Sequence, residues 1–256
     1  MKAPLLMVNI LFLTLISNSE LHADEYPAEL VWMNRVDLRL FVSGIIKEVF
    51  VKPGDLVVKG KQLVKLDTRI KQAQLEESVA ILELQNRLRD EAKRELDRAI
   101  ELYDRTVLSN HELELAHIAY ARANATYNSA KAKKIRAEIL LEKSTIVAPF
   151  DGYVLGLFAE TGQTVVSDLQ PVTLVTFARS GKMFARMKIE ASSLSSVSPG
   201  ATVKIKTGSN TFNGSVYTIA LEPEKEKDAL LYQVDVSFDT ENNRYRAGQP
   251  ATIILK

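Results

Sequence analysis

Few residues of this chain have the types and the spacing that enzyme chemistry requires. Beyond residue 23 the only histidines are His111 and His117, which are six residues apart. Residues six apart do not share a helix face, so the two imidazoles are poorly placed to bind one zinc ion. The chain has no cysteine to add a thiolate ligand or a nucleophile. The sequence therefore predicts no metal site.

Two carboxylates invite an acid–base interpretation, because Asp67 and Asp151 flank the same long segment of the chain. Aspartates beside turns more commonly cap backbone amides, and we favour that role here. No phosphate-binding glycine loop, G-x-S-x-G or H-E-x-x-H pattern occurs. We expect no catalytic residue and no cofactor, and the formal net charge of +1 argues against nucleic-acid binding.

The N-terminus resembles a secretory signal. Lys2 precedes a mostly apolar run at residues 5–16, and Ala23 follows a short polar stretch. Twelve helical residues span ~18 Å, which is less than the ~30 Å hydrocarbon core of a membrane. We predict a signal peptide over residues 1–23 and an exported protein; an uncleaved anchor or a buried N-terminal helix are the alternatives.

A long segment in the middle of the chain has the composition of helix. No glycine occurs between Gly60 and Gly152, and no proline between Pro53 and Pro149. Since these residues punctuate structure most strongly, residues 68–143 are predicted to be helical. A 3-4 spacing of apolar residues runs through the second half of the segment, at Leu113, Ala116, Tyr120, Ala123, Tyr127, Ala130, Ala137 and Leu141, with Lys134 as the exception. This pattern predicts a coiled-coil seam.

The first half of the helical segment carries a looser apolar pattern. We expect its seam to consist of Ile70, Ala73, Ile81, Leu84, Leu88, Ala92, Ala99 and Leu102. The sequence Ser109-Asn110-His111-Glu112 matches a capping box, so one helix should end near Thr106 and the next begin near Asn110. Two helices of about 35 residues would form an antiparallel hairpin about 50 Å long, with its tip near residues 103–109.

An internal repeat flanks the predicted hairpin. Residues 44–67 and 152–175 align without gaps, and eight of the 24 positions are identical. Each copy has the pattern strand, glycine turn, Val-Val strand, turn, strand. Neither copy is large enough to bury its own apolar face, so we expect the two to pack together around one core.

These two copies resemble the halves of a biotinyl/lipoyl-like domain, the first at residues 43–67 and the second beginning at Ala148-Pro149-Phe150-Asp151-Gly152. A lipoyl-like domain that is split by a helical hairpin and followed by a β-barrel resembles the periplasmic adaptors, or membrane fusion proteins, of the HlyD and RND efflux type. The resemblance implies an elongated α+β protein. Its domains would be the lipoyl-like module at 41–67 and 144–175, the hairpin at 68–143, and a β-barrel at 24–40 and 176–256.

The tip adds a second resemblance. Adaptors that dock on TolC-type channels resemble one another in an Arg-x3-Leu-x6-Ser pattern, which Arg98, Leu102 and Ser109 match. The resemblance implies that these residues dock on the channel. Simpler interpretations exist for each: Arg98 as a solvated charge, Leu102 as part of the seam and Ser109 as a helix cap.

The family resemblance also implies the partners. They would be an inner-membrane transporter of RND or ABC type, a TolC-type outer-membrane channel and further copies of the chain in a hexameric ring within the periplasm. Many RND adaptors carry a further membrane-proximal domain, which we expect to be missing or reduced here. Two alternatives remain. One is an envelope coiled-coil scaffold. The other is a biotin or lipoyl carrier, which would need a lysine on a tight turn between the two halves; this chain has the hairpin at that place, and Lys65 is expected within the preceding strand.

Overall fold

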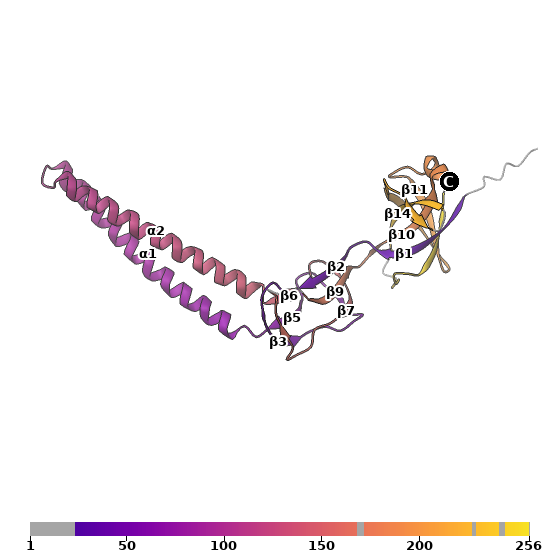
Figure 1. Ribbon diagram of the computed structural model, residues 1–256, viewed down its shortest axis with the longest axis horizontal. Helices are drawn as coiled ribbons and strands as arrows, with labels where there is room; N and C mark the ends of the chain where they lie inside the picture. The colour runs from indigo at the N-terminus through magenta and orange to yellow at the C-terminus, as the bar shows by residue number, and fades with distance from the viewer. Residues whose placement is uncertain (1–23, 168–171, 227–228, 241–243, 256) are drawn as a thin grey trace, which may run out of the picture. The chain divides into compact units, whose positions relative to one another are not determined.

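The computed structural model describes residues 24–167, 172–226, 229–240 and 244–255. The predicted signal peptide, residues 1–23, lies outside them. The described chain forms two compact units, one of residues up to Val31 and from Met183 onward, the other of Trp32–Lys182. Figure 1 shows their elements.

The first unit is a small β-barrel. Its strands lie in the order β10-β1-β15-β11-β12-β14-β13, and an additional pairing of β10 with β14 closes six of them into a ring. The bounds are β1 Glu25–Trp32, β10 Lys182–Glu190, β11 Thr202–Thr207, β12 Asn210–Ile219, β13 Glu224–Glu226, β14 Ala229–Asp239 and β15 Pro250–Ile254, with a 3-10 helix at Ala191–Ser196. Strand β11 alternates exposed and buried residues, as a barrel filled by side chains requires.

The second unit contains the repeat and the hairpin. One sheet has the order β2-β9-β7-β4 and the other the order β6-β5-β3-β8. Their bounds are β2 Arg35–Arg39, β3 Gly44–Val49, β4 Leu56–Val57, β5 Gln62–Leu66, β6 Thr145–Val147, β7 Gly152–Leu157, β8 Thr164–Val165 and β9 Thr173–Arg179. The predicted α+β fold with a split lipoyl-like module is confirmed.

The two halves of the repeat exchange strands. Gly44 pairs with Val165, and Gly152 pairs with Val57. The two pairs are equivalent, because Gly152 and Val165 each lie 108 residues after Gly44 and Val57. The turn glycines repeat as well: Gly54 N–H donates to Val154 O at 2.7 Å and Gly162 N–H to Ile46 O at 2.8 Å, both with φ +90°. Because each half completes the other's sheet, one apolar core holds residues of both, among them Ile46, Leu63, Val154 and Leu174.

The boundary between the units differs from the expected one. The family resemblance implies that residues 24–40 all belong to the barrel, but a bend at residues 33–34 divides this stretch into β1 and β2. Strand β2 pairs with β9, from Arg35 opposite Ala178 to Arg39 opposite Thr173, and so belongs to the lipoyl-like module. Strand β9 likewise runs past residue 175. The bend at residues 33–34 contains no glycine or proline. The local sequence therefore does not indicate that β1 and β2 belong to different units.

The hairpin consists of α1 (Arg69–Asp104) and α2 (Asn110–Glu142), which lie side by side and antiparallel (Figure 1). All nine predicted seam positions of α2 are buried or half-buried, so its seam is confirmed.

The predicted seam of α1 is wrong over its first half. Ile70, Ile81, Leu84 and Leu88 are exposed, by 39–75%. The positions that face α2 are Lys71, Leu75, Ser78, Leu82, Gln85, Arg89, Ala92, Leu96 and Ala99. Small residues at the contact let the helices approach, and the Arg89 guanidinium lies 4.1 Å from the centre of the Tyr127 ring. Only the partner helix selects between the two frames, because both carry large apolar residues: Leu75, Leu82 and Leu96 in one, and Ile70, Ile81, Leu84 and Leu88 in the other.

Candidate functional site

The candidate site is the turn that joins the two helices. After Asp104 the chain forms a Schellman motif: Thr106 N–H donates to Tyr103 O at 2.8 Å and Val107 N–H to Leu102 O at 2.9 Å. The motif requires a left-handed residue, and Thr106 takes that place with φ +60°. Glycine is the usual residue there, since a β-branched side chain is strained at positive φ. Local backbone strain is therefore located at the tip.

The start of α2 is held by the predicted capping box, which is confirmed. Ser109 Oγ accepts from Glu112 N at 3.3 Å, and Glu112 Oε2 accepts from Ser109 N at 3.0 Å and from Ser109 Oγ at 2.7 Å. Hydrogen bonds from the Ser109 hydroxyl and backbone stabilise the carboxylate and hold the pKa of Glu112 below its ordinary value of 4.5. This short network defines where the returning helix begins.

The three residues predicted to dock on a channel lie in and beside this turn. Arg98 is exposed and its Nη1 lies 2.8 Å from Glu95 Oε1, one turn earlier in α1. Leu102 is half-buried in the last turn of α1, and Ser109 is exposed at the N-terminus of α2. The hydrogen bonds of Arg98 and Ser109 go to different glutamates, so the structure places the three at one end of the hairpin without bonding them into one cluster.

Sequence reasoning missed two exposed residues at the same end. Val107 is 71% exposed and Tyr103 is 40% exposed. With the half-buried Leu102 they are apolar side chains of the tip, and the neighbouring Asp104 and Arg105 are exposed charges. The β-branched residues Thr106 and Val107 beside the capping box indicate a turn. They do not indicate which side chains of that turn are exposed.

The paired aspartates have capping roles, as expected. Asp67 Oδ1 accepts from Arg69 N at 3.1 Å, and its Oδ2 lies 2.6 Å from Arg69 Nη2. These hydrogen bonds lower the pKa of Asp67 from 3.8 to about 2. Asp151 Oδ1 accepts from Lys59 N at 2.7 Å. Within the described ranges, His, Cys, Asp and Glu side chains form no group of three that could hold a metal ion.

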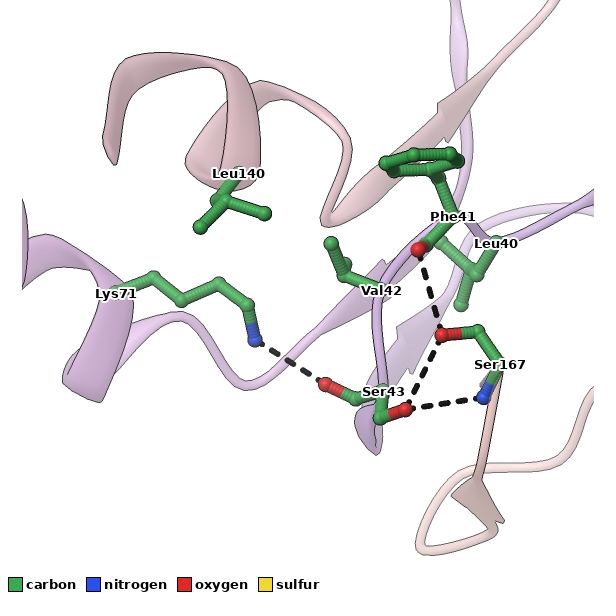
Figure 2. A pocket seen from close by; sticks show the side chains of 7 residues that line it. All are labelled: Leu40, Phe41, Val42, Ser43, Lys71, Leu140 and Ser167. Carbon is green, nitrogen blue, oxygen red and sulfur yellow. Dashed lines mark hydrogen bonds between the residues drawn. The ribbon is translucent and has the colours of Figure 1, made fainter. Parts of the chain in front are cut away.

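A cavity of ≈ 530 Å³ lies where the hairpin joins the β-module (Figure 2). Its lining comes from the segment before β3, from both helices and from the loop after β8: Leu40, Phe41, Val42, Ser43, Lys71, Leu140 and Ser167. Lys71 Nζ donates to Ser43 O at 3.2 Å, and Ser167 N donates to Ser43 Oγ at 3.0 Å. These bonds tie α1 to both halves of the repeat, so the cavity belongs to the joint that orients the hairpin.

The hairpin presents its tip at a distance from the module. Helix α1 has 36 residues, which correspond to ~54 Å at 1.5 Å per residue. Neither helix is apolar enough over a sufficient length to cross a membrane, as far as the described residues go. The arrangement is suited to contact between macromolecules rather than to chemistry on a small substrate.

Comparison with known proteins agrees with this geometry. The family model described as RND MFP, barrel-sandwich hybrid domain, matches residues 34–177. The macrolide export protein MacA of Yersinia pestis is 30% identical over 217 residues, which are 78% of this chain and 58% of that protein. MacA of Escherichia coli O157:H7 is 25% identical over 241 residues, 88% of this chain and 65% of that protein. The chain thus spans about three fifths of these relatives.

Solved structures show the same fold. The membrane fusion protein Spr0693 of Streptococcus pneumoniae R6 superimposes with a TM-score of 0.71 at 16% identity, covering 91% of this chain and 99% of that one. A MacA–MexA chimera that carries the Pseudomonas aeruginosa MexA α-hairpin gives 0.68 at 24% identity, covering 91% and 80%. With the family model matching more than half of its length, the chain belongs to the RND membrane fusion proteins, a family of non-enzymatic periplasmic adaptors.

Proposed function

We propose that this protein is the periplasmic adaptor of a tripartite efflux or secretion system, which links an inner-membrane transporter of RND or ABC type to a TolC-type outer-membrane channel. The observation that carries the proposal is the hairpin inserted into the split module. The hairpin holds exposed apolar side chains at its tip, ~54 Å from the lipoyl-like module. A subunit that bridges two partners needs two contact surfaces separated in this way.

In this proposal the tip residues Arg98, Leu102 and Ser109 contact the channel, and exposed Val107 extends their surface. The barrel and the lipoyl-like module contact the transporter. Several copies, six by resemblance to the family, surround a conduit in the periplasm. Since the matched relatives are named for macrolide export, macrolides are the first substrates to test.

An envelope scaffold without a transport role is the second candidate. The well-formed seam of α2, with Ala130 only 4% exposed, would serve it equally well. A scaffold does not require an apolar surface at the tip, however, whereas Val107 keeps 71% of its surface exposed. That exposure favours the adaptor.

In-vivo photo-crosslinking from the tip separates the two candidates. A photoreactive amino acid would replace Leu102 or Ser109 in the full chain, with Ala80 on the shaft of α1 as the control position. We expect crosslinks from the tip positions, but not from Ala80, to an outer-membrane channel identified by mass spectrometry. Crosslinks only to peptidoglycan-associated proteins or to the chain itself would support the scaffold and reject the adaptor.

A further inference from the structure

The cavity where the hairpin joins the β-module has an apolar side and a polar side (Figure 2). Its volume of ≈ 530 Å³ lies within the range of about 300–1,000 Å³ in which proteins bind small organic ligands. Leu40 and Val42 are buried, Leu140 of α2 is half-buried, and Phe41 keeps 74% of its surface exposed. Phe41 therefore offers apolar surface at the cavity that the described chain leaves uncovered.

One charged side chain lines the cavity, that of Lys71. It is half-buried, and its Nζ donates to Ser43 O at 3.2 Å. Since an ammonium carries three N–H groups, two remain after this bond. No carboxylate pairs with Lys71 anywhere in the described ranges. Partial burial of a cation without an opposite charge costs free energy, so the cavity favours an anion at this point.

The place of Lys71 in α1 adds to the positive potential. It lies in the first turn of the helix, and the N-terminus of a helix carries a partial positive charge. That turn has no acidic residue. Asp67, which precedes the helix, accepts hydrogen bonds from Arg69 on both carboxylate oxygens. The nearby carboxylate thus balances Arg69, and the charge of Lys71 is left for a ligand.

Two hydroxyl groups complete the polar side of the cavity. Ser43 Oγ accepts from Ser167 N at 3.0 Å and lies 3.1 Å from Ser167 Oγ. Ser167 Oγ donates to Phe41 O at 3.3 Å, so the Ser43 hydroxyl proton can turn from Ser167 to a ligand. Figure 2 shows the Lys71 side chain extending toward Ser43. An anion bound there can accept hydrogen bonds from both side chains.

The lining discriminates between classes of ligand. A cation would be repelled by Lys71, and a wholly apolar molecule would leave the ammonium without an anion. A ligand with several negative charges would need more cations than the single lysine of the lining. A molecule with one carboxylate and an apolar body satisfies both sides of the cavity.

We propose that this cavity binds an amphipathic carboxylate, whose acid group accepts hydrogen bonds from Lys71 and Ser43 and whose apolar part packs on Phe41, Val42 and Leu140. The proposal goes beyond the adaptor function and does not depend on it. Because the lining comes from both helices and from both halves of the repeat, the bound molecule would also hold the hairpin to the module.

Titration calorimetry of the full chain with decanoate tests the site. Decanol is the matched ligand, because it has the same hydrocarbon chain and lacks the charge. We expect decanoate to bind and decanol to bind at least about tenfold more weakly, the effect of losing a hydrogen bond between charged groups. Equal affinity for the two ligands, or no binding of decanoate at concentrations up to about 1 mM, would overturn the proposal.

Two substitutions separate the acid group from the apolar part. Lys71→Gln keeps a donor for Ser43 O and removes the charge, so it should weaken decanoate binding about tenfold and leave decanol binding unchanged. Phe41→Ala removes apolar surface and should weaken both ligands by the same factor, about fivefold. The matched controls are Lys93→Gln on α1 and Phe158→Ala on the module, both at exposed positions outside the lining.

The variants also locate the ligand. Equal weakening of decanoate binding by Lys93→Gln and Lys71→Gln, or equal weakening of both ligands by Lys71→Gln, would contradict the role of this cavity. Binding that none of the four substitutions alters would place the ligand elsewhere and reject the proposal. If Lys71→Gln by itself lowers Tm, the comparison of Phe41→Ala with Phe158→Ala still locates the site, because both rings are exposed.

Discussion

At the scale of single residues, the tip combines strain with a strong cap. Thr106 occupies a left-handed position where glycine would relax the backbone, and Ser109 begins the next helix three residues later. Strained residues persist where the surrounding structure or a function holds them. We propose that the partner binds at the tip. The strained conformation of Thr106 is therefore expected to matter for binding, although it lowers the stability of the fold.

Replacing Thr106 by glycine should stabilise the fold. The change removes the steric cost of a β-branched residue at φ +60°, which outweighs the extra freedom of glycine in the unfolded chain. We expect a gain of about 0.5–1 kcal/mol in the free energy of unfolding. Thermal unfolding followed by circular dichroism at 222 nm measures it.

The control for this change is Thr126→Gly, within α2, which should destabilise by about 0.5 kcal/mol because its backbone is helical. A loss of stability from Thr106→Gly, of the same sign as the control, would show that the left-handed turn is not strained.

The capping box should make stability depend on pH. Since the pKa of Glu112 is lower in the folded protein than its ordinary 4.5, its carboxylate stabilises the fold above that pH, and this contribution is lost as the pH falls through the folded pKa. Glu112→Gln should therefore lower Tm at neutral pH, and its difference from the native protein should shrink in acid.

Glu114→Gln serves as the matched change, because Glu114 is exposed on the same helix and takes no part in the box. Melting curves between pH 7 and about pH 3 give the comparison. A difference in Tm that stays constant over this range would argue against the Ser109–Glu112 interaction.

At the scale of elements, the repeat and the hairpin obey different constraints. The two halves of the module exchange strands through equivalent pairs, yet their equivalent glycines are not equally confined. A Cβ on Gly152 would lie 2.1 Å from Ala178 O, whereas one on Gly44 would lie 3.1 Å from Leu66 Cδ1. A backbone oxygen within a sheet cannot move aside as the end of a leucine side chain can.

Gly152→Ala should therefore destabilise the protein far more than Gly44→Ala. We expect a loss of about 3 kcal/mol for the first and about 1 kcal/mol for the second, because overpacking against fixed backbone separates β7 from β9. Urea unfolding of both variants provides the measurement. Equal losses would mean that β7 and β9 can shift to accept the methyl group.

At the scale of the whole molecule, the chain consists of two compact units, and only one of them contains the hairpin. The lipoyl-like module carries the hairpin, and the joint at Lys71 and Ser43 bonds the base of α1 to the module. The barrel is a separate unit with its own buried strands. In the proposed assembly, substitutions at the tip should reduce transport without changing the fold or the stability of either unit.

Leu102→Asp tests this separation. Placing a carboxylate on the apolar surface of the tip should reduce channel-dependent drug efflux by at least about tenfold, the effect of losing roughly 1.4 kcal/mol at an interface. The amount of protein in the envelope and its Tm should be close to native. Efflux of a macrolide from cells measures the change.

The matched control is Val79→Asp, which introduces the same charge on the shaft of α1, where the side chain is 44% exposed. Native efflux from a stable Leu102→Asp protein would remove the docking role of the tip.

The sequence by itself determined what local signals encode. The capping box at Ser109 and Glu112 located the turn, the 3-4 pattern located the seam of α2, and the repeat predicted a shared core. Each depends on residues close in the chain, or on a spacing that survives without a partner. The family resemblance then implied adaptor function, and the match over residues 34–177 bears out the family.

Only the tertiary structure decided which face of α1 meets α2, to which unit β2 belongs and which residue takes the left-handed turn. Helix α1 has two apolar faces, and only packing against the small residues of α2 selects one, which leaves Ile81, Leu84 and Leu88 exposed. Strand β2 joins the module because β9 offers it a free edge. Long-range packing decides the first two, since the local sequence permits both outcomes, whereas the left-handed turn at Thr106 is set by hydrogen bonds at the end of α1.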